Sequence, residues 1–152
     1  MTRRPGLPID EFFAPLPLLA VGVLALNDHV LKGSGLLPGW VTGKLSDLAG
    51  LFFFPLFLSA LVGLVTRRPA TRRRLVLACL FTGLGFALLQ LSAPVAAAYL
   101  WVHRALFPFL GPLDVTQDAT DLVALSMLPL AYLYGRRRLQ RRQRRAEAPS
   151  AP

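Results

Sequence analysis

The stretch GKLSDLAGLFFFP (residues 43–55) decides the fold, because it joins a short charged segment directly to a long apolar one. Lys44, Ser46 and Asp47 are followed by a run that carries no charge as far as Val65. A helix needs an apolar run of roughly this length to cross a hydrocarbon core of about 30 Å. We therefore predict a membrane-spanning helix over residues 48–66, with the three polar side chains at its mouth.

The composition of the chain favours a membrane protein over a water-soluble domain. Hydrophobic residues make up 54% of the 152 positions, and the mean hydropathy is +0.50. This hydrophobic share is higher than in ordinary globular domains. We expect one compact domain, residues 1–135, followed by a basic and partly disordered tail, residues 136–152.

The basic residues lie where they would orient membrane helices. The formal net charge is +9, but the cations gather at the ends of apolar runs, without the interleaved aromatic residues or the fold motif of a nucleic-acid reader. Short loops rich in Lys and Arg stay on the cytoplasmic side of a membrane. We therefore exclude nucleic acid as a partner and expect three groups on the cytoplasmic side: Arg3 and Arg4; Arg67, Arg68, Arg72, Arg73 and Arg74; and the arginines of residues 136–145.

The predicted fold class is an all-α polytopic membrane protein with four transmembrane helices and both termini cytoplasmic. Four crossings place all three basic groups on one side of the membrane. Residues 95–106 carry Tyr99, Trp101 and His103 between prolines and are too few to cross and return, so we expect an interfacial or re-entrant helix at the outer face. The four predicted spans are residues 12–31, 48–66, 75–93 and 118–134.

This topology brings polar side chains from all four spans to the same outer end. Polar and ionisable side chains inside a membrane are costly and mark functional sites. Asp121 lies deeper than its neighbours and needs a partner inside the bundle, which Lys44 or Lys32 can supply; Lys44 can equally pair with Asp28. The predicted binding residues are Asn27, Asp28, His29, Lys44, Ser46, Asp47, Gln90, Asp118 and Asp121.

Several of these residues also have a purely structural interpretation. Asp114, Asp118 and Asp121 follow an i, i+4, i+7 spacing and can charge-match the first turn of the last span. Ser46 is predicted to be the N-cap of the second span. Cys79, the single cysteine, is predicted to be a small buried hydrophobe.

Metal and nucleophilic chemistry receive less support. Asp28, His29, Asp47 and Asp121 offer oxygen ligands and one imidazole, which suit Mg²⁺, Mn²⁺ or Zn²⁺. The sequence has no short metal signature, however, so we predict no metal and no cofactor. Ser46 beside Asp47 lacks a nucleophile elbow and an oxyanion-hole motif. No catalytic residue is predicted.

Three features of the sequence resemble VanZ-like membrane proteins: the segment 43–52, Gln90 and the pair Asp121–Leu122. In that family a lysine precedes the apolar run of the second span, and a glutamine and an aspartate follow in the third and fourth. The chain differs in having Asp47 for a histidine, Ala87 for a glutamate and Leu125 for an asparagine. It looks still more like small bacterial four-span proteins of unestablished molecular activity. This resemblance implies a bacterial inner (plasma) membrane location and a role in the cell envelope.

The function we expect is non-enzymatic binding of a lipid or lipid-linked head group at the outer leaflet. The carboxylates would anchor the ligand, Lys44 would meet a phosphate or carboxylate, and Gln90 would add a neutral hydrogen bond. Membrane lipids are the expected partners, and oligomers remain open. Two alternatives stand beside this interpretation: a metal-dependent membrane hydrolase or transferase that uses the same carboxylates, and a structural or assembly subunit in which the cluster only holds the bundle together.

Overall fold

The computed structural model describes residues 14–32, 34–110 and 115–147, and every regular element among them is helical. This confirms the all-α class. The elements in chain order are α1 (Pro15–Leu26), the π-helical turn η2 (Asn27–Leu31), α2 (Gly39–Thr66), α3 (Arg72–Leu91), α4 (Ala93–Leu106), the 3₁₀ turn η3 (Pro108–Leu110), the 3₁₀ segment η4 (Ala119–Ser126) and α5 (Met127–Glu147).

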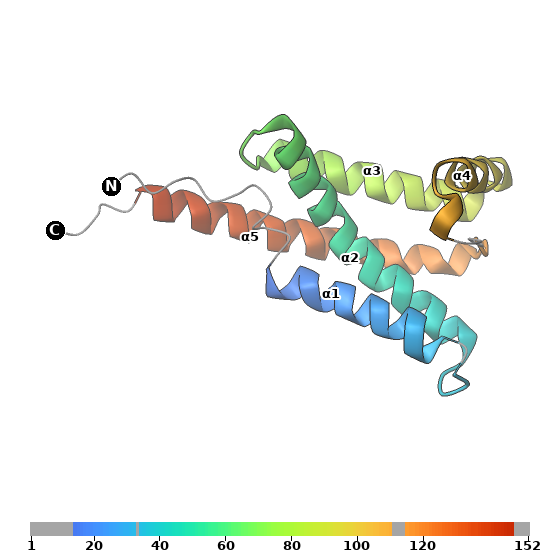
Figure 1. The fold of residues 1–152 in the computed structure, drawn as a ribbon. Coiled ribbons are helices and arrows are strands. Elements are labelled where there is room, and N and C mark those ends of the chain that lie inside the picture. The colour runs from blue at the N-terminus through green and yellow to red at the C-terminus, as the bar shows by residue number, and fades with distance from the viewer. Residues whose placement is uncertain (1–13, 33, 111–114, 148–152) are drawn as a thin grey trace.

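Four long segments alternate in direction along the bundle. In Figure 1, α1 runs from the middle of the molecule toward one end, α2 returns, α3 runs out again, and α5 comes back beside α2. The helix α2 contacts α1, α3 and α5 and so forms the centre of the bundle. The turn between α1 and α2, the end of α3 and the start of η4 consequently lie at one end, as the sequence predicts.

Among the residues that the structure describes, two helices are long and apolar enough to cross a membrane: α2 and α3. Only 33% of the most apolar window of α2 and 28% of that of α3 are buried inside the protein. A core helix of a soluble protein would be mostly buried, so the exposed apolar surface of α2 and α3 favours a lipid-facing position. The segment Pro15–Leu31 is apolar but shorter.

The second helix begins earlier than predicted. It starts at Gly39 after an N-cap at Pro38, whose carbonyl accepts from the amides of Val41 and Thr42. The prediction of Ser46 as the N-cap is therefore wrong, since Ser46 lies two turns inside α2. The helix continues through the polar residues because neighbouring helices supply partners for their side chains. Pro55 also lies inside α2 and is buried.

The core lies where α2, α3 and α5 meet. Its buried members are Leu56, Leu75, Cys79 and Ala131, which confirms the buried position of Cys79. Gly135 lets the backbone of α5 approach this cluster, because a Cβ there would lie 2.7 Å from a methyl of Leu75 and 3.0 Å from one of Leu56. Small residues at helix contacts permit such close packing in membranes.

The last predicted span has two parts. Residues 119–126 form the 3₁₀ segment η4, and α5 then continues to Glu147, well past the predicted end at residue 134. The helix is longer than predicted because Leu139 still packs against the buried core of α2, α3 and α5. Within α5 itself, the Arg138 guanidinium lies 5.8 Å from the ring centroid of Tyr134, one turn earlier. Arg72 of α3 also donates to the Tyr132 hydroxyl at 2.8 Å.

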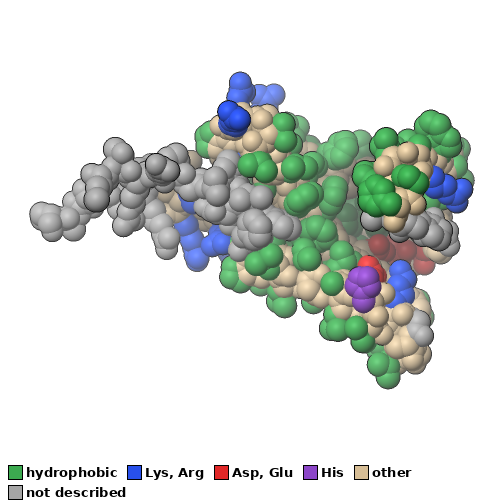
Figure 2. Space-filling model, in the orientation of Figure 1, with side chains coloured by type: hydrophobic (Ala, Val, Ile, Leu, Met, Phe, Trp, Pro, Cys, Tyr) green, Lys and Arg blue, Asp and Glu red, His purple; other side chains and the backbone are tan. Residues whose placement is uncertain are grey.

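The helix α4 lies across the others. It is seen nearly end-on in Figure 1, where α1, α3 and α5 run across the view, and it packs against α3. Its bounds agree within two residues with the predicted interfacial or re-entrant helix. Trp101 and Leu106 are exposed, and Figure 2 shows hydrophobic side chains gathered on this part of the surface.

Candidate functional site

The predicted convergence of polar residues takes place at the end of the bundle where α1 and α3 finish. Hydrogen bonds and ion pairs there join η2 to α2, α2 to η4, and η4 to α3. We call this set the polar end. It consists of two halves, one on each side of α2, that are centred on Asn27 and on Asp121.

Asn27 is the centre of the first half. Its side chain is fully buried (0% exposed), and its Nδ2 donates to the Thr42 carbonyl and to Ser46 Oγ, both at 2.7 Å. Ser46 Oγ in turn donates to Asp28 Oδ1 at 2.8 Å. The π-helical turn at Asn27 begins where these contacts form, and such turns occur frequently at functional sites. Asn27, Ser46 and Asp28 therefore form one hydrogen-bonded chain between η2 and α2.

Asp121 is the centre of the second half. Its Oδ1 lies 2.7 Å from Lys44 Nζ, and the same ammonium donates to Thr120 Oγ1 at 2.7 Å. The side chains of Lys44 and Asp121 are 25% and 15% exposed, so the ion pair is largely removed from solvent. The predicted pairing of Lys44 with Asp121 is confirmed. Lys44 is thus neutralised inside the protein, which argues against its predicted role toward a ligand phosphate.

Gln90 and Asp118 tie α3 to the start of η4. Gln90 Nε2 donates to Asp121 Oδ2 at 3.4 Å, and Gln90 Oε1 accepts from the Asp118 amide at 3.1 Å. Asp118 is the N-cap of η4 and accepts from the Thr120 amide at 2.8 Å, which confirms its predicted capping role. This hydrogen bond, with Lys44 3.9 Å away, lowers the pKa of Asp118.

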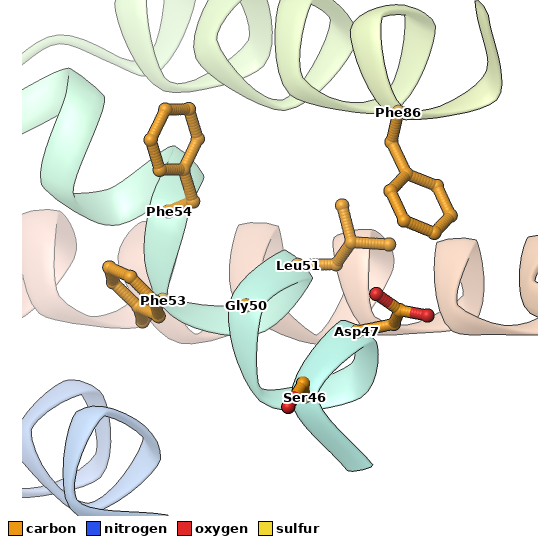
Figure 3. A pocket seen from close by; sticks show the side chains of 7 residues that line it. All are labelled: Ser46, Asp47, Gly50, Leu51, Phe53, Phe54 and Phe86. Carbon is orange, nitrogen blue, oxygen red and sulfur yellow. The ribbon is translucent and has the colours of Figure 1, made fainter. Parts of the chain in front are cut away.

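Asp47 differs from the other acids of the polar end. Its side chain is half-buried, and among the residues that the structure describes none hydrogen-bonds to the carboxylate or pairs with it. It lies on a pocket of about 200 Å³ between α2 and α3. Figure 3 shows the carboxylate beside Leu51 and facing the ring of Phe86. The other lining residues are Ser46, Gly50, Phe53 and Phe54.

His29 does not join the cluster. It is exposed on η2, and no described residue hydrogen-bonds to its ring. Asp28 lies at the edge of the polar end, where Lys32 Nζ approaches its carboxylate at 4.0 Å; Lys32 therefore pairs with Asp28 and not with Asp121. Asp114 lies outside the described residues.

Sequence reasoning missed three contributors. Thr120 Oγ1 accepts from Lys44, the Thr42 carbonyl accepts from Asn27, and Gln117 donates to the Leu89 carbonyl at 3.0 Å. The sequence could have pointed to Thr120 only through its hydroxyl, since Thr120 directly precedes Asp121. Backbone acceptors such as that of Thr42 carry no signal in a sequence.

The site offers hydrogen-bonding and charge chemistry. Within residues 14–32, 34–110 and 115–147, no group of three or more His, Cys, Asp or Glu side chains is placed to hold a metal ion. Ser46 donates to Asp28, and no imidazole lies within hydrogen-bonding distance of it among those residues. The arrangement can therefore present one carboxylate to a ligand from a wall of apolar side chains.

No protein-family model, no curated protein and no solved structure matches this chain. Only the sequence motifs quoted above therefore support the resemblance to VanZ-like proteins. The class that the described geometry defines is an antiparallel helical bundle with two candidate membrane spans and a polar cluster at one end.

Proposed function

We propose that this chain is an inner-membrane protein of four crossings, with both termini in the cytoplasm, that binds a lipid or lipid-linked head group at its outer face. The observation that carries the binding proposal is the Asp47 carboxylate, half-buried and without a partner among the described residues, on a pocket with apolar walls. An unpaired carboxylate in an apolar surround is costly. A ligand that supplies hydrogen-bond donors would remove this cost.

The arrangement of the bundle supports the two additional crossings. The segment Pro15–Leu31 and the pair η4–α5 both lie alongside α2 and run antiparallel to it. A helix of 1.5 Å rise per residue reaches about 25 Å over 17 residues, at the short end of what spans a membrane. The alternation of direction leaves the turn at residues 67–71 at the end opposite the polar end, which fits a cytoplasmic basic loop.

A structural role is the second candidate, and the ion pair favours it. Lys44, Thr120, Asp121 and Gln90 satisfy one another without a ligand. In this alternative the polar end only fastens η4 to α2 and α3. The two candidate functions differ in what they predict for Asp47. Its carboxylate forms no hydrogen bond or ion pair with a described residue, so a structural role does not require it.

The proposed topology is tested with reporter fusions. Alkaline phosphatase, which is active only outside the cytoplasm, is expected to be active when fused after residue 35 and inactive when fused after residue 145. Green fluorescent protein at the same positions gives the reciprocal readout. Equal activities at the two positions would contradict the four-crossing topology, whatever their sign.

The proposed binding is tested by replacing Asp47 with asparagine. The substitution keeps size and removes the charge, so we expect at least a tenfold loss of head-group affinity without a loss of stability. Binding of radiolabelled envelope lipid extract to the purified chain in nanodiscs measures the first quantity, and thermal unfolding in detergent measures the second. Asp28→Asn is the matched control, because Asp28 lies at the exposed edge of the polar end and does not line the pocket. Unchanged lipid retention in the Asp47 variant would reject the proposal in favour of the structural role.

A further inference from the structure

The walls of the Asp47 pocket are of only two kinds. Asp47 and Ser46 are polar, and Leu51, Phe53, Phe54 and Phe86 are apolar, with Gly50 between them. Ser46 is already occupied, since it accepts from Asn27 and donates to Asp28. The groups that a ligand would meet are therefore one carboxylate and several aromatic rings.

The nearby cations do not neutralise Asp47. Lys44 Nζ lies 2.7 Å from Asp121 and 3.9 Å from Asp118, and Lys32 approaches Asp28 at 4.0 Å. Two lysines thus face three other carboxylates, and no ion pair with Asp47 forms among the described residues. Among the residues that line the pocket, Asp47 alone has an acidic or basic side chain, and a carboxylate there favours a cationic ligand.

The aromatic walls favour the same kind of ligand. The face of an aromatic ring carries negative electrostatic potential, and rings placed around a cation are the usual way in which proteins bind substituted ammonium groups. The rings of Phe53 and Phe54 meet edge to face, with centroids 6.3 Å apart. Phe86 completes the wall from α3, on the side toward which Asp47 points (Figure 3).

The position of the pocket indicates a lipid as the source of the ammonium. The pocket lies on two helices in which most residues of the apolar windows are not buried inside the protein, and Phe54 on its wall is 38% exposed. At about 200 Å³ it is smaller than the sites that take drug-sized molecules. A small head group fits this volume, with its acyl chains outside along α2 and α3, whereas a lipid-linked saccharide does not.

We propose that the Asp47 pocket selects phospholipids whose head group ends in an alkylammonium, as in phosphatidylethanolamine. The proposal rests on the head-group binding proposed above. The carboxylate of Asp47 pairs with the ammonium, and the rings of Phe54 and Phe86 contact its methylene groups and share its charge. The ligand must then carry a positive charge. This differs from the expectation from the sequence, in which Lys44 would hold a phosphate or carboxylate of the ligand.

The test measures the affinity of the purified full chain, in nanodiscs of an inert lipid, for three labelled phospholipids with the same acyl chains. These are phosphatidylethanolamine, its N-acetyl derivative, which lacks the cation, and phosphatidylglycerol. We expect phosphatidylethanolamine to bind at least tenfold tighter than the other two. Asp47→Asn is expected to abolish this preference.

A matched pair of variants tests the aromatic wall. Phe86→Leu is expected to weaken phosphatidylethanolamine binding by about threefold, in line with an exposed cation–π contact. Phe109→Leu in η3, whose side chain is exposed and lies off α2 and α3 and outside the pocket, is expected to change nothing. Equal losses in the two variants would overturn the role assigned to the rings.

The remaining outcomes separate this inference from the proposed function. Tight binding of phosphatidylglycerol or the N-acetyl lipid that depends on Asp47 would overturn the ammonium requirement and leave head-group binding intact. Lipid binding that is indifferent to Asp47 would overturn both. Soluble phosphoethanolamine that competes as well as the lipid would overturn the lipid source. The comparison of three lipids on the unaltered chain stands even where a variant fails to fold.

Discussion

Replacing Asp121 with alanine is expected to cause the largest loss of stability of any ion-pair change at the polar end. The substitution leaves the Lys44 ammonium in a largely enclosed position without the carboxylate 2.7 Å from it. It also removes an acceptor from Gln90. Removal of one partner of a buried pair costs more than the pair itself contributes, because the remaining charge keeps its desolvation penalty. The measurement is unfolding of the purified chain by a denaturing detergent, followed by circular dichroism.

The double variant tests the physical reason for this loss. Replacing Lys44 with methionine in the Asp121→Ala background removes the uncompensated charge, and we expect it to restore most of the lost stability. Lys32→Ala is the control, since Lys32 is 60% exposed and loss of an exposed ion pair costs less than about 1 kcal/mol. A double variant no more stable than Asp121→Ala alone would contradict the explanation by a buried charge.

Comparison of the double variant with Asp47→Asn distinguishes the two candidate functions. If the polar end only fastens the bundle, both variants retain lipid as wild type does. If Asp47 binds a head group, the double variant keeps its lipid affinity and Asp47→Asn loses it, although the latter is the more stable protein of the two. Stability and binding are thus expected to depend on different acids of the polar end.

The sequence predicted the helical class and the common polar end because both follow from strong and simple patterns. Apolar runs such as residues 48–66 separate clusters of charge, and successive helices joined by short turns must alternate in direction. With the direction of each helix known, Lys44 and Lys32 were both candidate partners for Asp121, which lies 77 positions from Lys44. Topology therefore predicted an ion pair at this end, but not which lysine forms it.

The helix limits were harder to predict because tertiary contacts decided them. Residues 39–44 contain two glycines, and glycine is a poor helix former. In the structure the first turns of α2 are held by η2 through Asn27 and by η4 through Lys44. Ser46 is misassigned for the same reason, because its partner lies on η2 and not at its own helix end. The π-helical turn of η2 has no periodicity that a sequence reveals.

Asn27→Asp is expected to have the largest effect of any isosteric change at the polar end, a loss of at least about 3 kcal/mol. The Nδ2 group donates to the Thr42 carbonyl and to Ser46 Oγ, both at 2.7 Å, and lies 3.5 Å from Asp28 Oδ1. A carboxylate oxygen in that position would face the Thr42 carbonyl with no proton between them. It would also place a second buried negative charge beside Asp28.

Asn27→Leu separates the loss of hydrogen bonds from the introduction of charge. Leucine has the same branched shape and gives up both donors, but it buries no charge, so we expect a cost of about 1–2 kcal/mol. The order of stability should therefore be wild type, then leucine, then aspartate, measured by the same detergent unfolding. An aspartate variant as stable as the leucine variant would show that the side chain is not enclosed as the structure has it. The join between η2 and α2 would then need another explanation, because the other side-chain bond between them is that of Ser46 to Asp28, at the exposed rim.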